Sequence, residues 1–333
     1  MGWLQKIMSN VAGAPPQELT FVPSVPQKND SIPGVGVPIE ADNCYLELYL
    51  ESLRLERARS FATRFHAIAY SFVTLSREGE ERARLAAVSK PEKLAELDKD
   101  AVDRVITISK QMMAPTPFRG GTVSLEFGLF SVKSGNLLTP VLDLVTRLSS
   151  VAGISYVGAI KPFVPLITQG MDLLTSQRND TALEVGLDTD MSLATSFVAA
   201  IIARPKNAIA VEKLSLDEDR RLLLDDKPLD CGYAVFSIRA TSEKSDYGEI
   251  PELRMLFAAF QSALKRRKKK DAEDAVAAFR LAAIASPDLI PADARRLIEK
   301  VERKYAEAFV AGAPASFEFM KREETLAEIG LYR

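Results

Sequence analysis

A β-strand is predicted at Tyr45-Leu46-Glu47-Leu48-Tyr49-Leu50-Glu51, where a leucine occupies every second position. A period of two is typical of a strand that packs one face against a core and leaves the other face in water. The leucines are therefore expected in the core. Glu47, Tyr49 and Glu51 are expected on the solvated face of the same strand.

Further strands are predicted along the chain after this one. In the second half of residues 64–76, apolar side chains occur at both odd and even positions. This is typical of a central strand that is buried on both faces. The charged segment 77–103 is expected to be a helix-prone connection. Residues 216–229 are expected to form a hairpin that turns at Asp225-Asp226-Lys227-Pro228. The remaining expected strands cover 105–109, 122–132, 182–188, 208–214 and 233–240.

Two of these strands share a short motif. Leu125-Glu126-Phe127-Gly128-Leu129 and Leu183-Glu184-Val185-Gly186-Leu187 both read L-E-x-G-L. A glycine inside a strand often marks a bulge or a close approach of the backbone to another group. The motif predicts that the two strands are neighbours, bent at the same level of one sheet.

Helices are predicted in two parts of the chain. A helical hairpin inserted into the β domain is expected over 139–177, where Thr139 and Pro140 start the first helix. From Pro251 onward, apolar residues recur at helical spacing in three successive stripes. Ser286-Pro287-Asp288 is expected to separate the second helix from the third. A last helix is expected to begin at Ser316.

The N-terminus combines an amphipathic segment with a proline-rich one. Residues 14–38 contain six of the 18 prolines, so we expect 14–40 to be an extended tether without a packed core. Five apolar side chains before it fall on one face of a short helix, which is marginal alone in water and should lie against something else. They are Trp3, Leu4, Ile7, Met8 and Val11.

The predicted fold class is α+β: a mostly antiparallel β-sandwich with an inserted helical hairpin, followed by a small C-terminal helical domain. The predicted parts are an amphipathic segment (1–13), the tether (14–40), a β-sandwich domain (41–245) with the insertion 139–177, and a helical domain (246–333).

Charge and cysteine content restrict the class of protein. The 333 residues include 43 Lys and Arg against 45 Asp and Glu, a balance that argues against nucleic acid as the main partner. Cys44 and Cys231 both lie in apolar runs and are expected to be buried thiols in a reducing compartment. The longest uncharged runs, 148–160 and 191–203, are too short to span a bilayer. The expected location is the cytoplasm.

A catalytic constellation is not apparent in the sequence. His66 is the only histidine, which excludes a site with several histidine ligands. It is either a general base or, as we prefer, a histidine satisfied by a hydrogen bond in the core or at a sheet edge. Cys44 and Cys231 have no base nearby in sequence to activate them as nucleophiles. No catalytic residue and no cofactor is therefore predicted.

Charged clusters leave two further interpretations open. The acidic groups Asp188-Thr189-Asp190, Asp217-Glu218-Asp219 and Asp225-Asp226 are carboxylates suited to Ca²⁺ or, equally, ordinary turn residues, and no metal site is predicted from them. The run Lys265-Arg266-Arg267-Lys268-Lys269-Lys270 is a candidate anion-binding site. The alternative for this run, which we prefer, is a solvated junction between two helices.

The preferred functional hypothesis is a non-catalytic intracellular interaction protein, an adaptor or assembly component. The amphipathic N-terminal segment would anchor in a groove of a protein partner. The alternative is a peripheral membrane-binding or membrane-damaging effector that uses the same segment. A third hypothesis is an enzyme of unrecognised type. A protein partner is expected, nucleic acid is not, and the sequence is compatible with an oligomer.

Overall fold

The computed structural model describes residues 19–55, 59–60, 63–76, 83–89, 105–133, 181–244, 248, 250–309 and 326. The chain divides into two compact units. The first, called the β unit here, comprises Met1–Glu40, Leu46–Pro115 and Arg119–Thr241. The second, called the helical unit, comprises Ala41–Tyr45, Thr116–Phe118 and Ser242–Arg333. The predicted insertion 139–177, the segment 1–13 and the last predicted helix lie outside the described residues.

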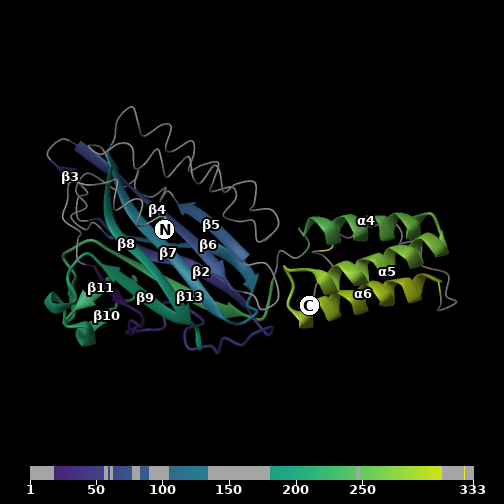
Figure 1. Cartoon of the computed structure of the whole chain (residues 1–333), viewed down its shortest axis with the longest axis horizontal. Helices are drawn as coiled ribbons and strands as arrows, with labels where there is room; N and C mark the ends of the chain where they lie inside the picture. Colours follow the sequence, from purple (N-terminus) through teal and green to yellow (C-terminus); the bar gives the residue numbers. More distant parts are fainter. Residues whose placement is uncertain are drawn as a thin grey trace. The chain divides into compact units, whose positions relative to one another are not determined.

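The β unit contains two large sheets (Figure 1). The first has the strand order β1-β9-β13-β2-β6. Its strands are β1 (Thr20–Val22), β9 (Phe197–Ile202), β13 (Tyr233–Thr241), β2 (Tyr45–Arg54) and β6 (Val105–Pro117). The second has the order β3-β4-β7-β8, and β5 also pairs with β4. Its strands are β3 (Arg59–Ser60), β4 (Thr63–Leu75), β5 (Ala83–Ser89), β7 (Thr122–Lys133) and β8 (Thr181–Ser192).

The predicted α+β class is confirmed, since antiparallel sheets are followed by a helical part. An aromatic contact joins the two large sheets. Phe236 of β13 stacks on Phe127 of β7, with 6.1 Å between the ring centroids. Because side chains alternate along a strand, the other even-numbered residues of β13 face the same way as Phe236. The finer arrangement of the two sheets as a sandwich stays a prediction.

The neighbouring strands predicted from the L-E-x-G-L motif are confirmed. β7 pairs with β8, and Gly128 lies directly opposite Gly186. The register shifts just beyond this pair, where Phe130 pairs with Leu183 and Glu184 becomes the extra residue of a bulge. Gly128 also lies opposite Tyr70 of β4. A Cβ built on Gly128 would come within 2.1 Å of the Tyr70 ring, so the glycine leaves room for that aromatic side chain.

A small third sheet confirms the predicted hairpin, but its turn is shorter than predicted, because Lys227 and Pro228 belong to a strand. Its order is β10 (Leu214–Leu216), β11 (Leu222–Leu224), β12 (Lys227–Pro228). Leu224 pairs with Lys227, so Asp225 and Asp226 form a two-residue loop. Both aspartates have positive φ, 50° and 63°, as a two-residue turn that follows the twist of the strands requires.

The expectation of an extended tether is wrong for residues 19–40. Thr20–Val22 form β1, and the backbone continues to bind the first sheet through Val25 N to Val198 O (2.8 Å) and Gly36 N to Ser196 O (2.8 Å). The tether was predicted from the proline and glycine content. These residues exclude a long strand, but they permit a folded segment that lies across a sheet. We call residues 23–39 the strap.

A second apolar cluster explains why the strap folds. Residues of β9 and β13 that point away from Phe236 pack against the strap and the small sheet. The cluster therefore covers the outer face of β9 and β13, and these two strands are buried on both sides. Its members include Val22, Val25, Ile32, Val198, Ala200, Ile202, Leu214, Leu216, Leu222, Leu229, Tyr233 and Val235.

Three predictions of local structure need correction. The connection 77–103 contains a strand, β5, which pairs with β4 along Ala83–Ser89. Residues 208–214 are not a strand; they form two short 3₁₀ turns, Lys206–Ala208 and Val211–Lys213, that lead into β10. The strand in this region is β9, which the sequence analysis did not predict. Pairing partners, and not local composition, decide each of these segments.

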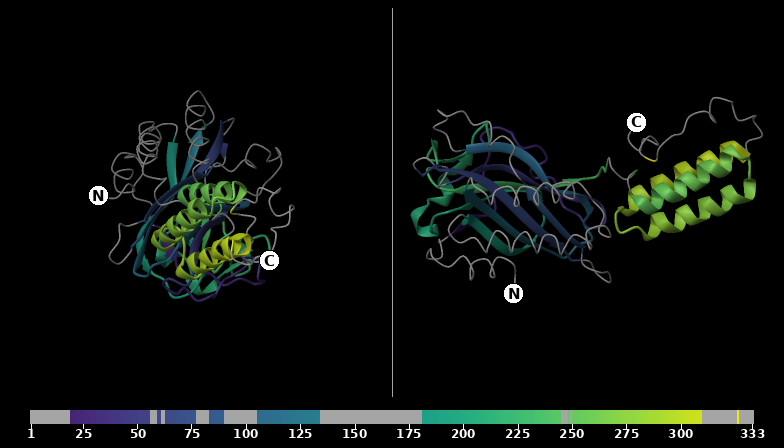
Figure 2. Two further views of the ribbon diagram at one scale, coloured as in Figure 1. Left: turned by 90° about the vertical axis from the view of Figure 1, so that its right-hand side faces the viewer. Right: turned by 90° about the horizontal axis from the view of Figure 1, so that it is seen from above.

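The helical unit contains α4 (Pro251–Lys265), α5 (Lys269–Ala285) and α6 (Pro291–Phe309). Its three apolar stripes are confirmed by buried Phe257, Phe279 and Leu297, one from each helix. The chain break at 286–288 and the start of α6 at Pro291 are also confirmed. α5 contacts both α4 and α6, and the three run side by side (Figure 2).

A buried hydrogen-bond group marks the first turn of α6. The Tyr45 hydroxyl donates to Asp293 Oδ2 at 2.6 Å and accepts from Ile290 N at 3.2 Å. Asp293 also faces Arg296 Nη1 at 3.3 Å. A carboxylate in the first turn is favourable beside the positive end of the helix dipole. No helix within the described part of the chain combines the length and apolar composition that crossing a bilayer requires.

Candidate functional site

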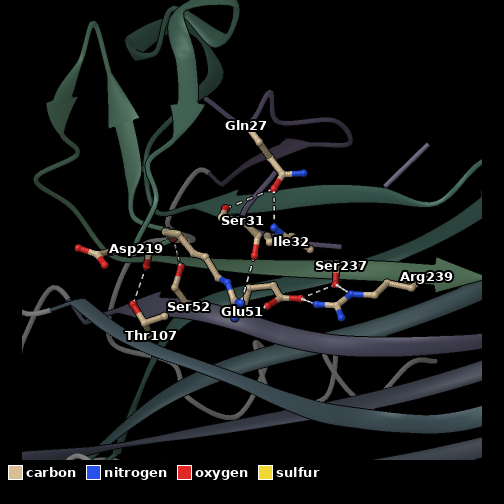
Figure 3. A network of polar contacts seen from close by, with 10 residues as sticks. Gln27, Ser31, Ile32, Glu51, Ser52, Thr107, Asp219, Ser237 and Arg239 are labelled. Carbon is tan, nitrogen blue, oxygen red and sulfur yellow. Dashed lines mark hydrogen bonds and ion pairs between the residues drawn. The ribbon is translucent and has the colours of Figure 1, made fainter. Parts of the chain in front are cut away.

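Glu51 is the centre of a polar network in the β unit (Figure 3). It was predicted on a solvated face, and that prediction is wrong, because its side chain is 0% exposed. Its strand does present Glu47, Tyr49 and Glu51 on one face, as predicted. The strap and the small sheet cover the end of that face where Glu51 lies.

Two arginines and a serine hold the Glu51 carboxylate. Oε1 accepts from Ser237 Oγ at 2.5 Å and from Arg239 Nη2. Oε2 accepts from Arg220 Nη1 at 3.1 Å. Ser237 and Arg239 alternate with buried core residues on β13, which places both on the covered face. Two guanidinium groups thus face one buried carboxylate.

Arg220 connects this carboxylate to the covering layer. Its Nη2 donates to Ser31 O at 3.2 Å, and its own carbonyl accepts from Ser52 Oγ at 2.6 Å. Arg220 has a φ of 61°, in the left-handed region, between β10 and β11. Such a conformation is uncommon for a residue with a side chain and is held here by contacts on both sides of the backbone. Thr107 donates to the carbonyl of the preceding Asp219 at 2.7 Å.

The strap is ordered locally by one glutamine. Gln27 Oε1 accepts from Ile32 N at 2.8 Å and from Ser31 Oγ at 3.3 Å, which closes a turn of the strap (Figure 3). This turn places the Ser31 carbonyl where Arg220 reaches it. The network therefore ties the strap, the small sheet and the first large sheet together.

Tyr49 extends the network toward the surface. The Arg239 guanidinium lies 4.1 Å from the Tyr49 ring centroid, a cation–π contact. The Tyr49 hydroxyl donates to Glu47 Oε1 at 3.2 Å, and Gln111 Nε2 donates to the same Glu47 oxygen at 2.8 Å. Partial burial, together with the charge and hydrogen bond of Glu47, raises the pKa of Tyr49 to about 12 against the opposing effect of Arg239.

The chemistry of the Glu51 group suits structural support better than catalysis. Both oxygens of the Glu51 carboxylate are occupied by donors of its own protein, the two guanidinium groups and the Ser237 hydroxyl. Ser237 Oγ donates to that same carboxylate and accepts from Arg239 Nε at 3.0 Å, so its hydroxyl is held on both sides within the network. Side chains that hold a buried charge in this way are strongly coupled, and removing one leaves the others uncompensated.

High pH should weaken the fold through Tyr49. A phenol with a folded pKa of about 12 and an unfolded value of 10.0 contributes its full stabilisation below pH 10 and loses it as pH rises from 10 toward 12. We expect the loss of stability in that range to be smaller in Tyr49→Phe. The difference in phenolate absorbance between wild type and Tyr49→Phe should titrate near pH 12.

Glu47→Gln is the informative companion to this titration. Removing the Glu47 charge should lower the midpoint of the Tyr49 phenolate titration, because that charge disfavours the phenolate. A Tyr49 midpoint near the ordinary value of 10.0, unaffected by Glu47→Gln, would contradict the geometry described here.

Of the three candidate catalytic residues His66, Cys44 and Cys231, the structure describes the side chains of the two cysteines. His66 lies in β4 opposite Val132, and its side chain is outside the described residues. Cys44 and Cys231 are buried, as predicted, and form no disulfide.

Comparisons with protein-family models, with curated proteins and with solved structures gave no match. The case for a function therefore depends on the residues themselves.

Asp188 and Asp190 lie within β8, and the other two acidic clusters lie in the turns of the small sheet. Within the residues that the structure describes, no group of three or more histidine, cysteine or carboxylate side chains is placed to hold a metal ion. Asp188 lies opposite Glu126 on neighbouring strands, and the other clusters contact nearby groups. These contacts are Asp217 with Arg221 N, Glu218 with Asn29, Asp219 with Arg221, Asp225 with Lys213 and Asp226 with Lys28.

The basic run occupies the junction between α4 and α5, as one of its two interpretations predicted. Lys265 ends α4, Lys269 starts α5, and all six side chains are exposed. Whether this junction also binds anions is a separate question. The predicted partner-binding residues Trp3, Leu4, Ile7, Met8 and Val11 lie outside the described residues.

The Glu51 network was missed by sequence reasoning. Alternation along β2 marks the face of Glu51, but it does not reveal that a second layer covers that face. A signal did exist, because the strap and the small sheet carry Val25, Ile32 and Leu222, apolar residues that need a surface to pack against.

Proposed function

We propose that this protein is a non-catalytic interaction protein, an adaptor or assembly component of the cytoplasm. Its amphipathic N-terminal segment, with Trp3, Leu4, Ile7 and Met8 as anchors, docks in a groove of a protein partner. The helical unit provides a second contact with the partner. The observation that carries the proposal is an exposed apolar face on α5.

α5 has apolar side chains on two faces. Phe279 and Ala283 are buried between the helices. Leu281 and Ile284 are 70% and 66% exposed, although they are large and apolar. They are three residues apart and therefore adjacent on the surface of the helix.

A third exposed side chain belongs to the same end of the helical unit. Met255, near the start of α4, is 66% exposed. The chain turns back between α4 and α5, so the start of α4 and the end of α5 lie at the same end of this helix pair. Single scattered apolar residues are normal on a surface, whereas adjacent large ones, such as Leu281 and Ile284, are typical of a contact site.

The test is affinity isolation of a partner from the native host, repeated with purified components. Deleting residues 1–12 should abolish recovery of the partner and leave the thermal stability of the protein unchanged. Leu281→Gln with Ile284→Gln should weaken binding by at least about 10-fold, the usual effect of removing buried interface anchors. Recovery of the same partner by the truncated protein at full yield would contradict the proposal.

Val35→Gln with Val37→Gln is the matched control for the helical variant. Both valines are exposed, at 40% and 41%, but lie in the strap of the β unit. This pair removes a similar kind of exposed apolar surface from a different place. If it weakens binding as much as the α5 pair does, the contact is not specific to α5.

A further inference from the structure

The six cations between α4 and α5 form a rigid, exposed tip, which we call the basic tip (Lys265–Lys270). Every one of these side chains is exposed. The backbone is fixed by three hydrogen bonds, from Arg266 N to Ser262 O at 3.1 Å, from Arg267 N to Leu264 O at 3.0 Å and from Lys268 N to Ala263 O at 3.0 Å. The cations are thus held on a folded turn.

The turn reverses the chain between α4 and α5. Arg267 has a φ of 52°, in the left-handed region, where the chain leaves α4 and reverses into α5. Successive side chains of a reversing turn project in different directions. The carboxylate nearest to the turn, Asp271, is 3.3 Å from Lys268 Nζ. Residues 265–274 hold six cations against three carboxylates, so positive charge predominates.

The C-terminal end of α6 adds cations to the same end of the helical unit. Because α4, α5 and α6 run in alternating directions, the end of α6 lies at the end that carries the basic tip (Figure 1). Arg303 and Lys304 lie there. The pKa of the neighbouring Lys300 is lowered, first by its own partial burial and then by the charges of Arg303 and Lys304. Tyr305 and Phe309, whose ring centroids are 5.5 Å apart, occupy the last turns of α6.

We propose that the basic tip binds an anionic lipid surface. The cations of the basic tip lie together at one end of the helices. The cations along α6 do not form a continuous row, because Glu299, Glu302 and Glu307 lie among them. A lipid surface can contact cations that lie together at one end of a helix pair, whereas a nucleic acid strand needs cations that track its length. Aromatic side chains at the same end suit the membrane interface. This inference goes beyond the proposed function, which uses the N-terminal segment and the α5 face.

The experiment measures binding of the full chain to vesicles of phosphatidylcholine with and without about 30 mol % phosphatidylserine. A cation near such a surface strengthens binding by about five-fold. Arg266→Gln, Arg267→Asn, Lys269→Gln and Lys270→Gln together should weaken binding to the anionic vesicles by more than about 100-fold. Asn is chosen at position 267 because it tolerates the left-handed conformation.

A matched variant removes four exposed cations elsewhere: Lys206→Gln, Lys227→Gln, Arg254→Gln and Arg295→Gln. It has the same net charge as the tip variant, and we expect it to bind within a few-fold of wild type. Circular dichroism and thermal unfolding of each variant confirm that it folds. Binding of wild type should fall at high salt, since screening weakens contacts between exposed charges.

Three outcomes would overturn the inference. They are absence of wild-type binding to the anionic vesicles at low salt, equal binding by the tip and matched variants, and tighter binding of the basic tip to duplex DNA than to the vesicles. The proposed function is judged separately. Deleting residues 1–12 should leave tip-dependent vesicle binding intact while abolishing recovery of the protein partner.

Discussion

Replacing Glu51 with alanine should lower the free energy of unfolding of the β unit by about 3–5 kcal/mol, the usual effect of breaking a buried ion pair. The variant leaves Arg220 and Arg239, which are only 22% and 13% exposed, without their shared carboxylate. Ser237 loses its acceptor as well. Denaturant unfolding followed by the circular dichroism of β-structure measures the change.

Glu47→Ala is the matched control for this substitution. Glu47 lies on the same face of β2 but is half-buried, and its described partners Tyr49 and Gln111 are uncharged. Its loss should destabilise by about 1–2 kcal/mol, less than the loss of Glu51, because water can reach a half-buried site and replace part of its hydrogen bonding. Equal effects of the two substitutions would mean that Glu51 is not the buried centre described here.

A second variant tests whether the instability of Glu51→Ala comes from the arginine charges left without a partner. Apolar residues in place of all three charges, as in Glu51→Leu with Arg220→Met and Arg239→Met, remove the uncompensated guanidinium groups. Replacing a buried ion group by packed apolar side chains is often close to neutral. The triple variant should therefore recover much of the stability that Glu51→Ala loses.

Gly128→Ala should destabilise the β unit by about 3 kcal/mol, at the upper end of the range for overpacking a core. The added Cβ would lie 2.1 Å from Tyr70 Cε1 and 2.9 Å from its Cζ. The Tyr70 ring is 3% exposed and stacks on Phe130, with 5.8 Å between centroids, so it has little room to move away.

A double-mutant cycle checks that the ring is the cause. In a Tyr70→Ala background, Gly128→Ala should cost less than about 1 kcal/mol, because the ring that clashes is absent. In a Tyr70→Phe background it should remain costly. Tyr70→Phe alone should not destabilise, since the hydroxyl is buried without a hydrogen-bond partner in the described structure. A cost of Gly128→Ala that is independent of position 70 would contradict this account.

Local patterns predicted those elements that depend on neighbours within a few residues. The period of two along Leu46, Leu48 and Leu50 reflects the pleat of a single strand. The helical spacing of Phe257 and Phe260 reflects the turn of a single helix. The turn at Asp225 and Asp226 is decided by the conformations that two residues permit, and each of these predictions is confirmed.

One prediction reached across the chain with success. Gly128 and Gly186 are 58 positions apart and lie opposite one another in the sheet. The shared L-E-x-G-L motif made this prediction possible, because two neighbouring strands that bend at the same level both need a glycine there. The strands β9 and β5 have no repeated motif of this kind, and they were not predicted. Their formation depends on pairing with other strands, which a local sequence pattern does not indicate.

The spacing of apolar residues in the sequence by itself determined which faces of β2 and of the C-terminal helices are apolar. Only the tertiary structure decided that the polar end of β2 is covered. The small sheet comes from residues 214–228, far from β2 in the sequence, and together with the strap it covers Glu51 beside Arg220 and Arg239. A period of two reports which side a residue faces, whereas burial depends on whether a distant segment packs on that side.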